Sequence, residues 1–181
     1  MHNEPGNKPA HSPAATDVAQ SVRLRVRPFQ PADQAAARRL ILDGLGEHFG
    51  FIDETLNPDL DEIAAHYIDT GQRFFVAELE GRIVGTAGLH FEPISPRMGV
   101  GEAARIVRMS VDRSNRRRGI ASALVDACRQ AAQEHGAREL RAFTEPHWPD
   151  ALGFYTSLGF VEYGRDPIDV HLRLSLASDR P

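Results

Sequence analysis

The spacing of apolar and polar residues predicts a series of short strands and amphipathic helices. Along residues 22–27 apolar residues alternate with arginine, which is the period-two pattern of a half-buried strand. Apolar residues then recur at helical spacing after Pro31 and after Asn57-Pro58, where proline suits the first turn of a helix. We expect the first helix at residues 32–45, and Gly71 can end the second.

A group of strands follows these two helices. Residues 74–79 and 82–91 are strand-like and meet at Glu80-Gly81, a pair typical of a tight hairpin. The next ten residues, 92–101, hold two prolines and two glycines and predict a loop. Residues 103–111 then predict a third strand in this group.

The rest of the chain alternates helices with strands. An apolar stripe from Ile120 to Ala131 predicts a long helix that Gly136 ends. The later elements are expected as a strand at 140–144, a helix at 149–158, a strand at 160–163 and a last strand at 170–174. Early hairpins and a later β-α-β unit together predict an α/β (α+β) fold, with a mixed sheet and helices on both faces.

Length and composition fit one soluble domain. Residues 1–21 are rich in Pro, Asn, Ser and Ala without an apolar cluster, so we expect a disordered tail before a single domain at 22–176. The single cysteine, Cys128, excludes an intrachain disulfide and favours a reducing compartment. Without a bilayer-length apolar run or a signal-peptide pattern, we expect a cytoplasmic protein with no membrane partner.

Charge argues against a nucleic-acid partner. The formal net charge is −4, so the chain has no general attraction for a polyanion. A nucleic-acid module needs a positive face with interleaved aromatic residues, and the basic cluster at residues 113–118 is too short to provide one.

The strongest chemical signal is the sequence Arg116-Arg117-Arg118-Gly119-Ile120-Ala121, between a predicted strand and a predicted helix. A helix N-terminus leaves backbone N–H groups unpaired and carries partial positive charge, and a glycine lets the backbone approach an anion. A Walker A loop is excluded because no Gly-Lys-Ser/Thr follows, and a dinucleotide fingerprint lacks its second and third glycines. Taken alone, the turn also fits a solvated basic loop.

This strand-turn-helix resembles the central motif of the GNAT superfamily of N-acetyltransferases. There Gln/Arg-x-x-Gly-x-Gly/Ala holds the pyrophosphate of acetyl-CoA, and this chain has Arg-x-x-Gly-x-Ala. Residues 108–112 resemble the family's fourth strand, and Ala151-x-x-Phe154-Tyr155-x-x-x-Gly159-Phe160 resembles its late helix and next strand. The resemblance implies a mostly antiparallel sheet of six to seven strands whose central strands splay apart.

The same resemblance implies a reaction. An acetyl group would pass from acetyl-CoA, the co-substrate, to a primary amine by direct attack in a ternary complex, and no metal is expected. The acceptor would be a small-molecule or peptide amine, and the family allows a homodimer. The implied cofactor-binding residues are Met109, Ser110, Val111, Arg116, Arg117, Arg118, Gly119, Ile120, Ala121 and Ser122.

Tyr155 is the expected general acid by this resemblance. A phenol with a pKa near 10 is protonated at neutral pH, so it can give a proton to the departing thiolate. Helical spacing alone favours a different interpretation, a core aromatic residue, because Tyr155 lies on an apolar stripe with Ala151, Phe154 and Leu158.

The general base is left open by the sequence. Many relatives have asparagine where this chain has Trp148, and some use a glutamate as base where it has Arg105. That substitution keeps an alternative open, a non-catalytic acyl-CoA-binding regulatory module of the same fold, although the retained Tyr155 argues against it. Glu102 is our first candidate for the base, and the other candidates near the inferred gap are His90, Glu145 and His147.

An acidic segment provides the one indication of the acceptor. Residues 43–62 contain seven carboxylates and no lysine or arginine. In the family the segment between the first two helices shapes the acceptor pocket, so Glu47, Asp53 and Glu54 could attract a cationic amine. A solvated surface, with acids near helix N-termini, fits the same pattern equally well.

Overall fold

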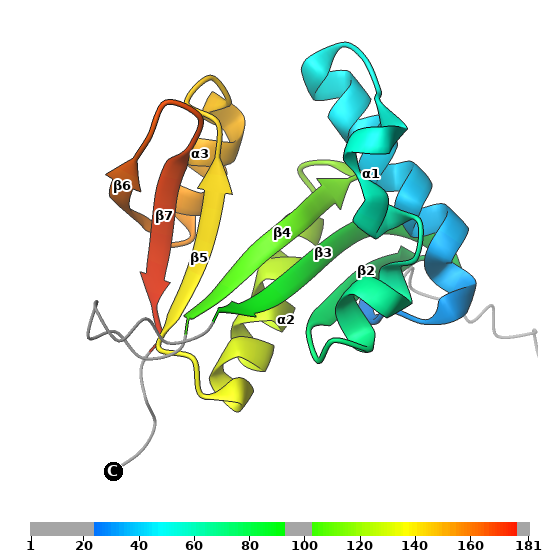
Figure 1. Ribbon diagram of the computed structural model, residues 1–181, viewed down its shortest axis with the longest axis horizontal. Helices are drawn as coiled ribbons and strands as arrows, with labels where there is room; N and C mark the ends of the chain where they lie inside the picture. Colours follow the sequence, from blue (N-terminus) through cyan, green and yellow to red (C-terminus); the bar gives the residue numbers. More distant parts are fainter. Residues whose placement is uncertain (1–23, 93–102, 177–181) are drawn as a thin grey trace, which may run out of the picture.

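The computed structural model describes residues 24–92 and 103–176, which form an open seven-stranded sheet covered by helices (Figure 1). The predicted tail at 1–21, nearly all of the loop predicted at 92–101, and Glu102 lie outside the described residues. The strands are β1 (Arg25–Pro28), β2 (Arg73–Leu79), β3 (Arg82–Glu92), β4 (Ala103–Val111), β5 (Glu139–Thr144), β6 (Val161–Arg165) and β7 (Val170–Ser175).

Within residues 24–92 and 103–176, three α-helices and five short helical segments connect these strands. The α-helices are α1 (Gln34–Phe49), α2 (Ile120–His135) and α3 (Pro149–Ser157). The short segments in the described chain are η1 (Pro31–Asp33), η2 (Glu54–Leu56), η3 (Pro58–Leu60), η4 (Ala64–Ile68) and η5 (Arg113–Asn115).

The strand order is β1-β2-β3-β4-β5-β7-β6, and within the described residues every neighbouring pair is antiparallel except β4 with β5. This confirms the predicted mixed, mostly antiparallel sheet. The parallel pairing of β4 with β5 extends only from Ala103 opposite Glu139 to Ile106 opposite Ala142. Beyond that point the two strands diverge, so the predicted splay of the central strands is also confirmed (Figure 1).

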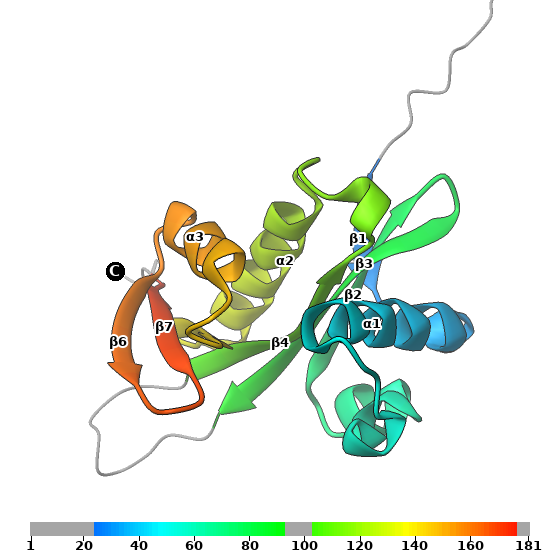
Figure 2. The same cartoon turned by 90° about the horizontal axis from the view of Figure 1, so that it is seen from above.

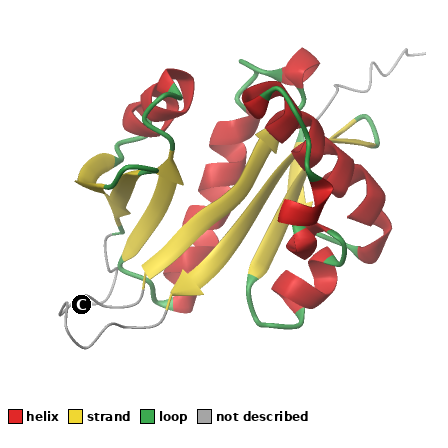
Figure 3. Ribbon diagram, turned by 45° about the horizontal axis from the view of Figure 1, so that its top comes forward, coloured by secondary structure: helices red, strands yellow, loops and turns green. Residues whose placement is uncertain are grey.

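Helices cover both faces of the sheet. The helix α1 lies on one face, and α2 and α3 lie on the other (Figure 2). The short segments η2 to η4 lie on the same side as α1 (Figure 3). Each side of the sheet has its own apolar core. The apolar stripe predicted for α2 packs in the core on the α2 side, where Leu124, Val125 and Cys128 are fully buried.

Local sequence signals explain several boundaries. Glu80 and Gly81 both have positive φ, 52° and 73°, so the hairpin between β2 and β3 turns through the two predicted residues. Gly136 ends α2 in the left-handed conformation, as predicted. The helix α1 runs four residues past its predicted end at Leu45, and Gly50 terminates it with φ 74°.

The predicted second helix is not regular. The segment after Asn57-Pro58 forms the 3-10 turn η3 and then the π-helical segment η4. Gln34 of α1 explains the break, because its side-chain amide donates to the Leu60 carbonyl at 2.8 Å and accepts from the Ile63 N–H at 3.0 Å. The Ile63 N–H has one hydrogen to donate and gives it to Gln34, so it is not available for the bond of a continuous helix.

Candidate functional site

The split between β4 and β5 leaves one edge of β4 without a strand partner. Residues 107–111 of β4 pair with β3 but lie beyond the last pair with β5. A bulge occurs in this stretch, where Arg108 has φ 53° and the Thr86 hydroxyl donates to its carbonyl oxygen at 2.9 Å. An unpaired strand edge of this kind can hydrogen-bond an extended ligand.

The basic turn leads from the end of this edge into α2. Gly119 is the N-cap of α2 with φ 78°, and Arg117 also has positive φ, 63°. The first helical bond runs from the Ala123 N–H to the Gly119 carbonyl, and the N–H groups of residues 119–122 have no acceptor within the described chain. A Cβ placed on Gly119 would meet no atom within 4 Å, so the space before these donors is open. The turn can therefore accept an anion.

The three arginines of the turn differ in their contacts. The Arg116 side chain donates to the Val111 carbonyl at 3.1 Å and to the Glu47 carboxylate at 2.6 Å, which braces the turn against β4 and α1. Arg118 donates to the Asn115 side chain at 3.0 Å, and Arg117 is exposed. Arg117 and Arg118 therefore carry the solvent-facing positive charge of the turn.

The other residues predicted to bind the cofactor present their side chains in different directions. The Ser110 hydroxyl donates to the Leu40 carbonyl of α1 at 3.2 Å, whereas Met109 and Val111 pack on the α2-side core. Ile120 is buried in the same core. Because the Ser110 side chain faces α1, this residue can contact a ligand on the α2 side only through its backbone. Ala121 and Ser122 are half-buried in the first turn of α2.

Tyr155 lies in the α2-side core and is 6% exposed. Its ring packs against Phe160, with ring centroids 5.2 Å apart, and α3 packs on β5. Burial, with a smaller effect from Cys128, raises the pKa of Tyr155 well above its usual value. The phenol is therefore protonated at neutral pH, as an acid requires, while its packing is that of a core aromatic residue. Its role as acid stays a prediction.

The structure separates the candidate bases. Glu102 lies outside the described residues. His90 lies on β3 opposite Arg105, and burial together with the Arg105 charge lowers its pKa, so its imidazole is neutral at neutral pH. Glu145 is paired with His48 at 3.2 Å, and His147 is exposed.

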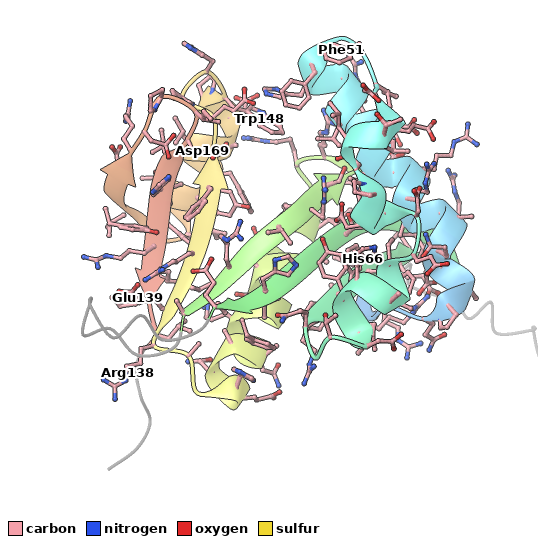
Figure 4. The ribbon with its side chains drawn as sticks, in the orientation of Figure 1. Phe51, His66, Arg138, Glu139, Trp148 and Asp169 are labelled. Atoms are coloured by element: carbon pink, nitrogen blue, oxygen red, sulfur yellow. The ribbon has the colours of Figure 1, made fainter. Side chains whose placement is uncertain are left out.

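His90 opens onto two adjoining cavities on the α1 side of the sheet, of about 500 and 440 Å³. His66, His90 and Arg105 line both cavities, and His66 lies on the η4 segment beside β3 (Figure 4). The Arg105 side chain donates to Glu92 at 2.6 Å and lies over the Phe143 ring. The pocket therefore has a mixed polar and apolar lining and contains a neutral imidazole.

A half-buried ion pair forms one wall of this pocket. Arg108 donates to Asp59 at 2.9 Å through Nε and to the Asn57 side chain at 2.8 Å, and the Tyr67 hydroxyl donates to Asp59 at 2.8 Å. Burial alone would raise the pKa of Asp59, but these hydrogen bonds outweigh it and the pKa lies below its usual value. Asp59 is therefore a carboxylate whose charge Arg108 neutralises.

The acidic segment at residues 43–62 is also paired with arginines from other elements. Glu47 contacts Arg116 at 2.6 Å, and Glu54 contacts Arg38 at 2.6 Å. Asp53 accepts the Thr55 N–H at 3.0 Å and so caps η2. The tertiary structure thus brings arginines to a segment that has none of its own. Their positive charge weakens the attraction for a cationic amine that the sequence predicts.

An aromatic contact connects the two sides of the split. The His48 ring at the end of α1 stacks on Trp148 with centroids 3.9 Å apart, and Trp148 and Phe51 lie at the same end of the molecule (Figure 4). With the His48–Glu145 pair, this contact joins α1 to the segment after β5. Sequence reasoning identified Trp148 only as a departure from the family pattern and missed His48, which carries no local signal.

The described residues contain no group of three or more His, Cys, Asp or Glu side chains arranged to hold a metal ion. Among the described helices, none has the length and apolar character needed to cross a membrane.

Comparison with known proteins gives consistent similarities in sequence. The sequence profile of the acetyltransferase (GNAT) family matches residues 38–160. Human N-acetyltransferase 8B is 34% identical over 125 residues, which are 68% of this chain and 54% of that protein. Rat N-acetyltransferase 8 is 31% identical over 121 residues, 66% of this chain and 54% of that protein. The chain thus spans about half the length of the curated relatives it matches.

Solved structures show the same fold. A GNAT-family acetyltransferase from Staphylococcus aureus superposes with a TM-score of 0.73 at 21% identity, covering 86% of this chain and 100% of the other. The PaiA N-acetyltransferase of Thermoplasma acidophilum, solved in complex with coenzyme A, gives a TM-score of 0.68 at 13% identity, with 84% and 99% covered. At these identities the likeness concerns the fold alone.

Proposed function

Because the chain belongs to the acetyltransferase (GNAT) family, we propose that it transfers an acetyl group from acetyl-CoA to a primary amine by direct attack in a ternary complex. The observation that carries the proposal is the continuity of two binding features. The unpaired edge of β4, residues 107–111, leads through a short turn into the open N-terminus of α2. An extended thioester with a pyrophosphate at one end matches this arrangement.

On the α2 side of the sheet, the chain would bind acetyl-CoA mainly through its backbone. The N–H groups of residues 119–122 would hold the pyrophosphate, and Arg117 and Arg118 would add positive charge. The β4 edge, including Met109 and Val111, would hydrogen-bond the pantetheine arm as a neighbouring strand does. A backbone N–H aimed at the acetyl oxygen would stabilise the oxyanion, an effect typically of about 3 kcal/mol in enzymes.

The acceptor amine would enter from the opposite face. The pocket beside β3 and β4 lies on the α1 side, whereas Tyr155 belongs to the α2-side core. If the amine attacks from the α1 side and the thiolate leaves toward the α2 side, the base must lie on the α1 side and the acid on the α2 side. An alkylamine with a pKa of about 10.4 must first lose a proton at pH 7, which costs about 4.6 kcal/mol.

His90 is the base that we propose from the described residues. Its lowered pKa leaves it neutral at neutral pH, and it lines the pocket. In the reaction a C–N bond forms as the C–S bond breaks, His90 takes the proton of the attacking nitrogen, and Tyr155 gives its hydroxyl proton to the thiolate. Proton exchange with solvent then restores both side chains. Glu102 remains a second candidate for this role.

We propose a small-molecule or peptide amine as the acceptor, with Glu47, Asp53 and Glu54 contributing a modest attraction for its cationic form. Their partners Arg116 and Arg38 reduce this attraction, so it should be weaker than the sequence implies. A cytoplasmic location and a homodimer stay predictions.

The direct test is a screen for thiol release. The purified chain would be mixed with acetyl-CoA and a broad panel of primary amines, and release of free CoA thiol would be measured with and without each amine. We expect amine-dependent thiol release and an N-acetylated product by mass spectrometry. Binding of acetyl-CoA by calorimetry without turnover on any amine would instead favour a non-catalytic acyl-CoA-binding module.

A further inference from the structure

Two buried side-chain polar atoms of the described residues lack a hydrogen-bond partner, Arg129 Nε and Thr144 Oγ1. Arg129 is partly exposed and its guanidinium still contacts Asp126 at 3.0 Å. For Thr144 the hydroxyl is the only polar side-chain group, and the residue is 6% exposed. Burying a hydroxyl without a partner destabilises a folded protein. The Thr144 hydroxyl therefore needs an explanation outside the described chain itself.

The position of Thr144 identifies what could reach this hydroxyl. Thr144 ends β5, two residues past Ala142, where the pairing with β4 stops. Alternation along a strand puts its side chain on the same face as those of Leu140 and Ala142, which belong to the α2-side core together with Tyr155. The hydroxyl thus lies beside the split between β4 and β5, on the face where the cofactor is proposed to bind.

A second buried threonine, on β3 beside β4, provides a contrast. Thr86 on β3 is fully buried, and its hydroxyl donates to the Arg108 carbonyl at 2.9 Å. That bond holds the bulge of β4. The chain therefore satisfies the Thr86 hydroxyl with its own backbone, whereas residues 24–92 and 103–176 provide no such partner for Thr144.

We propose that the Thr144 hydroxyl hydrogen-bonds the pantetheine arm of acetyl-CoA, so that the bound ligand supplies the partner that the described part of the chain lacks. This inference rests on the proposed function, because it requires acetyl-CoA in the split. The arm offers amide groups and a thioester carbonyl, and a threonine hydroxyl can donate to or accept from such groups. Thr144 is then a binding residue, which the sequence motifs do not identify.

The test compares Thr144→Val with Thr144→Ser in the full chain. Valine keeps the shape of threonine and removes the hydroxyl, whereas serine keeps the hydroxyl. In the ligand-free protein we expect Thr144→Val to raise Tm by about 2–4 °C, because it removes an unpaired buried hydroxyl. The same change at Thr86 should lower Tm, since it removes a satisfied hydrogen bond. In calorimetric titrations, Thr144→Val should weaken acetyl-CoA binding by about tenfold, and Thr144→Ser should stay near wild type.

Titration with CoA distinguishes the two possible partners on the arm. Equal weakening for CoA and acetyl-CoA supports a bond to a pantetheine amide, and weakening for acetyl-CoA alone supports a bond to the thioester carbonyl. Wild-type affinity of Thr144→Val for both ligands overturns the inference, as does equal weakening by Val and Ser. If Thr144→Val does not fold, Thr144→Ser against Thr144→Ala provides a second comparison of the hydroxyl. Failure of the wild-type chain to bind acetyl-CoA rejects the proposed function instead.

Discussion

A carboxylate placed at Gly119 gives the sharpest test of the anion site at the start of α2. Gly119 has φ 78°, and a side chain there would meet no protein atom within 4 Å. Asp and Asn tolerate this left-handed conformation better than other side chains, so Gly119→Asp and Gly119→Asn should both fold. The two variants have nearly the same shape and differ by one negative charge.

The magnitude follows from Coulomb's law at a partly exposed site. Two unit charges about 5 Å apart repel by about 1 kcal/mol at the dielectric constant of water and about 3 kcal/mol at an effective value near 20. Because Gly119 is exposed, the lower figure applies. The pyrophosphate carries about two negative charges, so the repulsion sums to about 2 kcal/mol. The observed loss of affinity should therefore be at least tenfold, or about 1.4 kcal/mol. We therefore expect Gly119→Asp to weaken acetyl-CoA binding at least about tenfold, with Gly119→Asn within about threefold of wild type.

The assay is calorimetric titration of acetyl-CoA at two ionic strengths, with Tm measured for every variant. Gly136→Asn is a matched control, because Gly136 at the other end of α2 also has positive φ, 90°, and open space before it. It should change Tm about as much as Gly119→Asn does and leave affinity unchanged. Equal affinities of folded Gly119→Asp and wild type would show that the pyrophosphate binds elsewhere. Equal weakening by Asp and Asn would show a steric effect without a charge effect.

Three further predictions concern the chemistry and the acceptor. Tyr155→Phe keeps the ring packing and should lower turnover by about 10²-fold while acetyl-CoA affinity and Tm stay near wild type; near-normal turnover would leave Tyr155 as a core residue. A base must be deprotonated to act, and the pKa of His90 is lowered, so kcat/KM of the wild type should rise with pH through a pKa below the usual histidine value. The pH profile of His90→Gln, measured between pH 5 and 8, should lack this rise. A variant that keeps the rise would reject His90 as the base. Changing Glu47, Asp53 and Glu54 together to their amides should lower kcat/KM for a cationic acceptor at saturating acetyl-CoA and reduce the salt dependence of that kcat/KM. An unchanged salt dependence would show that these three carboxylates are only a solvated surface.

The sequence by itself determined the elements whose signals are local. Glu80-Gly81 makes a turn because both residues can adopt positive φ, and Gly136 ends α2 for the same reason. The basic turn with Gly119 could be identified because a strand, a glycine and a helix start follow each other within a few residues. Such preferences act over one or two turns of backbone and need no partner from elsewhere in the chain.

Only the tertiary structure decided which groups meet across the sheet. Gln34 breaks the predicted second helix from 29 positions away, by accepting the Ile63 N–H. Arg116 neutralises Glu47 across 69 positions, although the acidic segment appeared free of positive charge in sequence. The unpaired hydroxyl of Thr144 has no sequence signature, because it depends on where β4 and β5 separate. Pairing between distant residues follows from how whole elements pack, and the pattern along one segment does not contain that information.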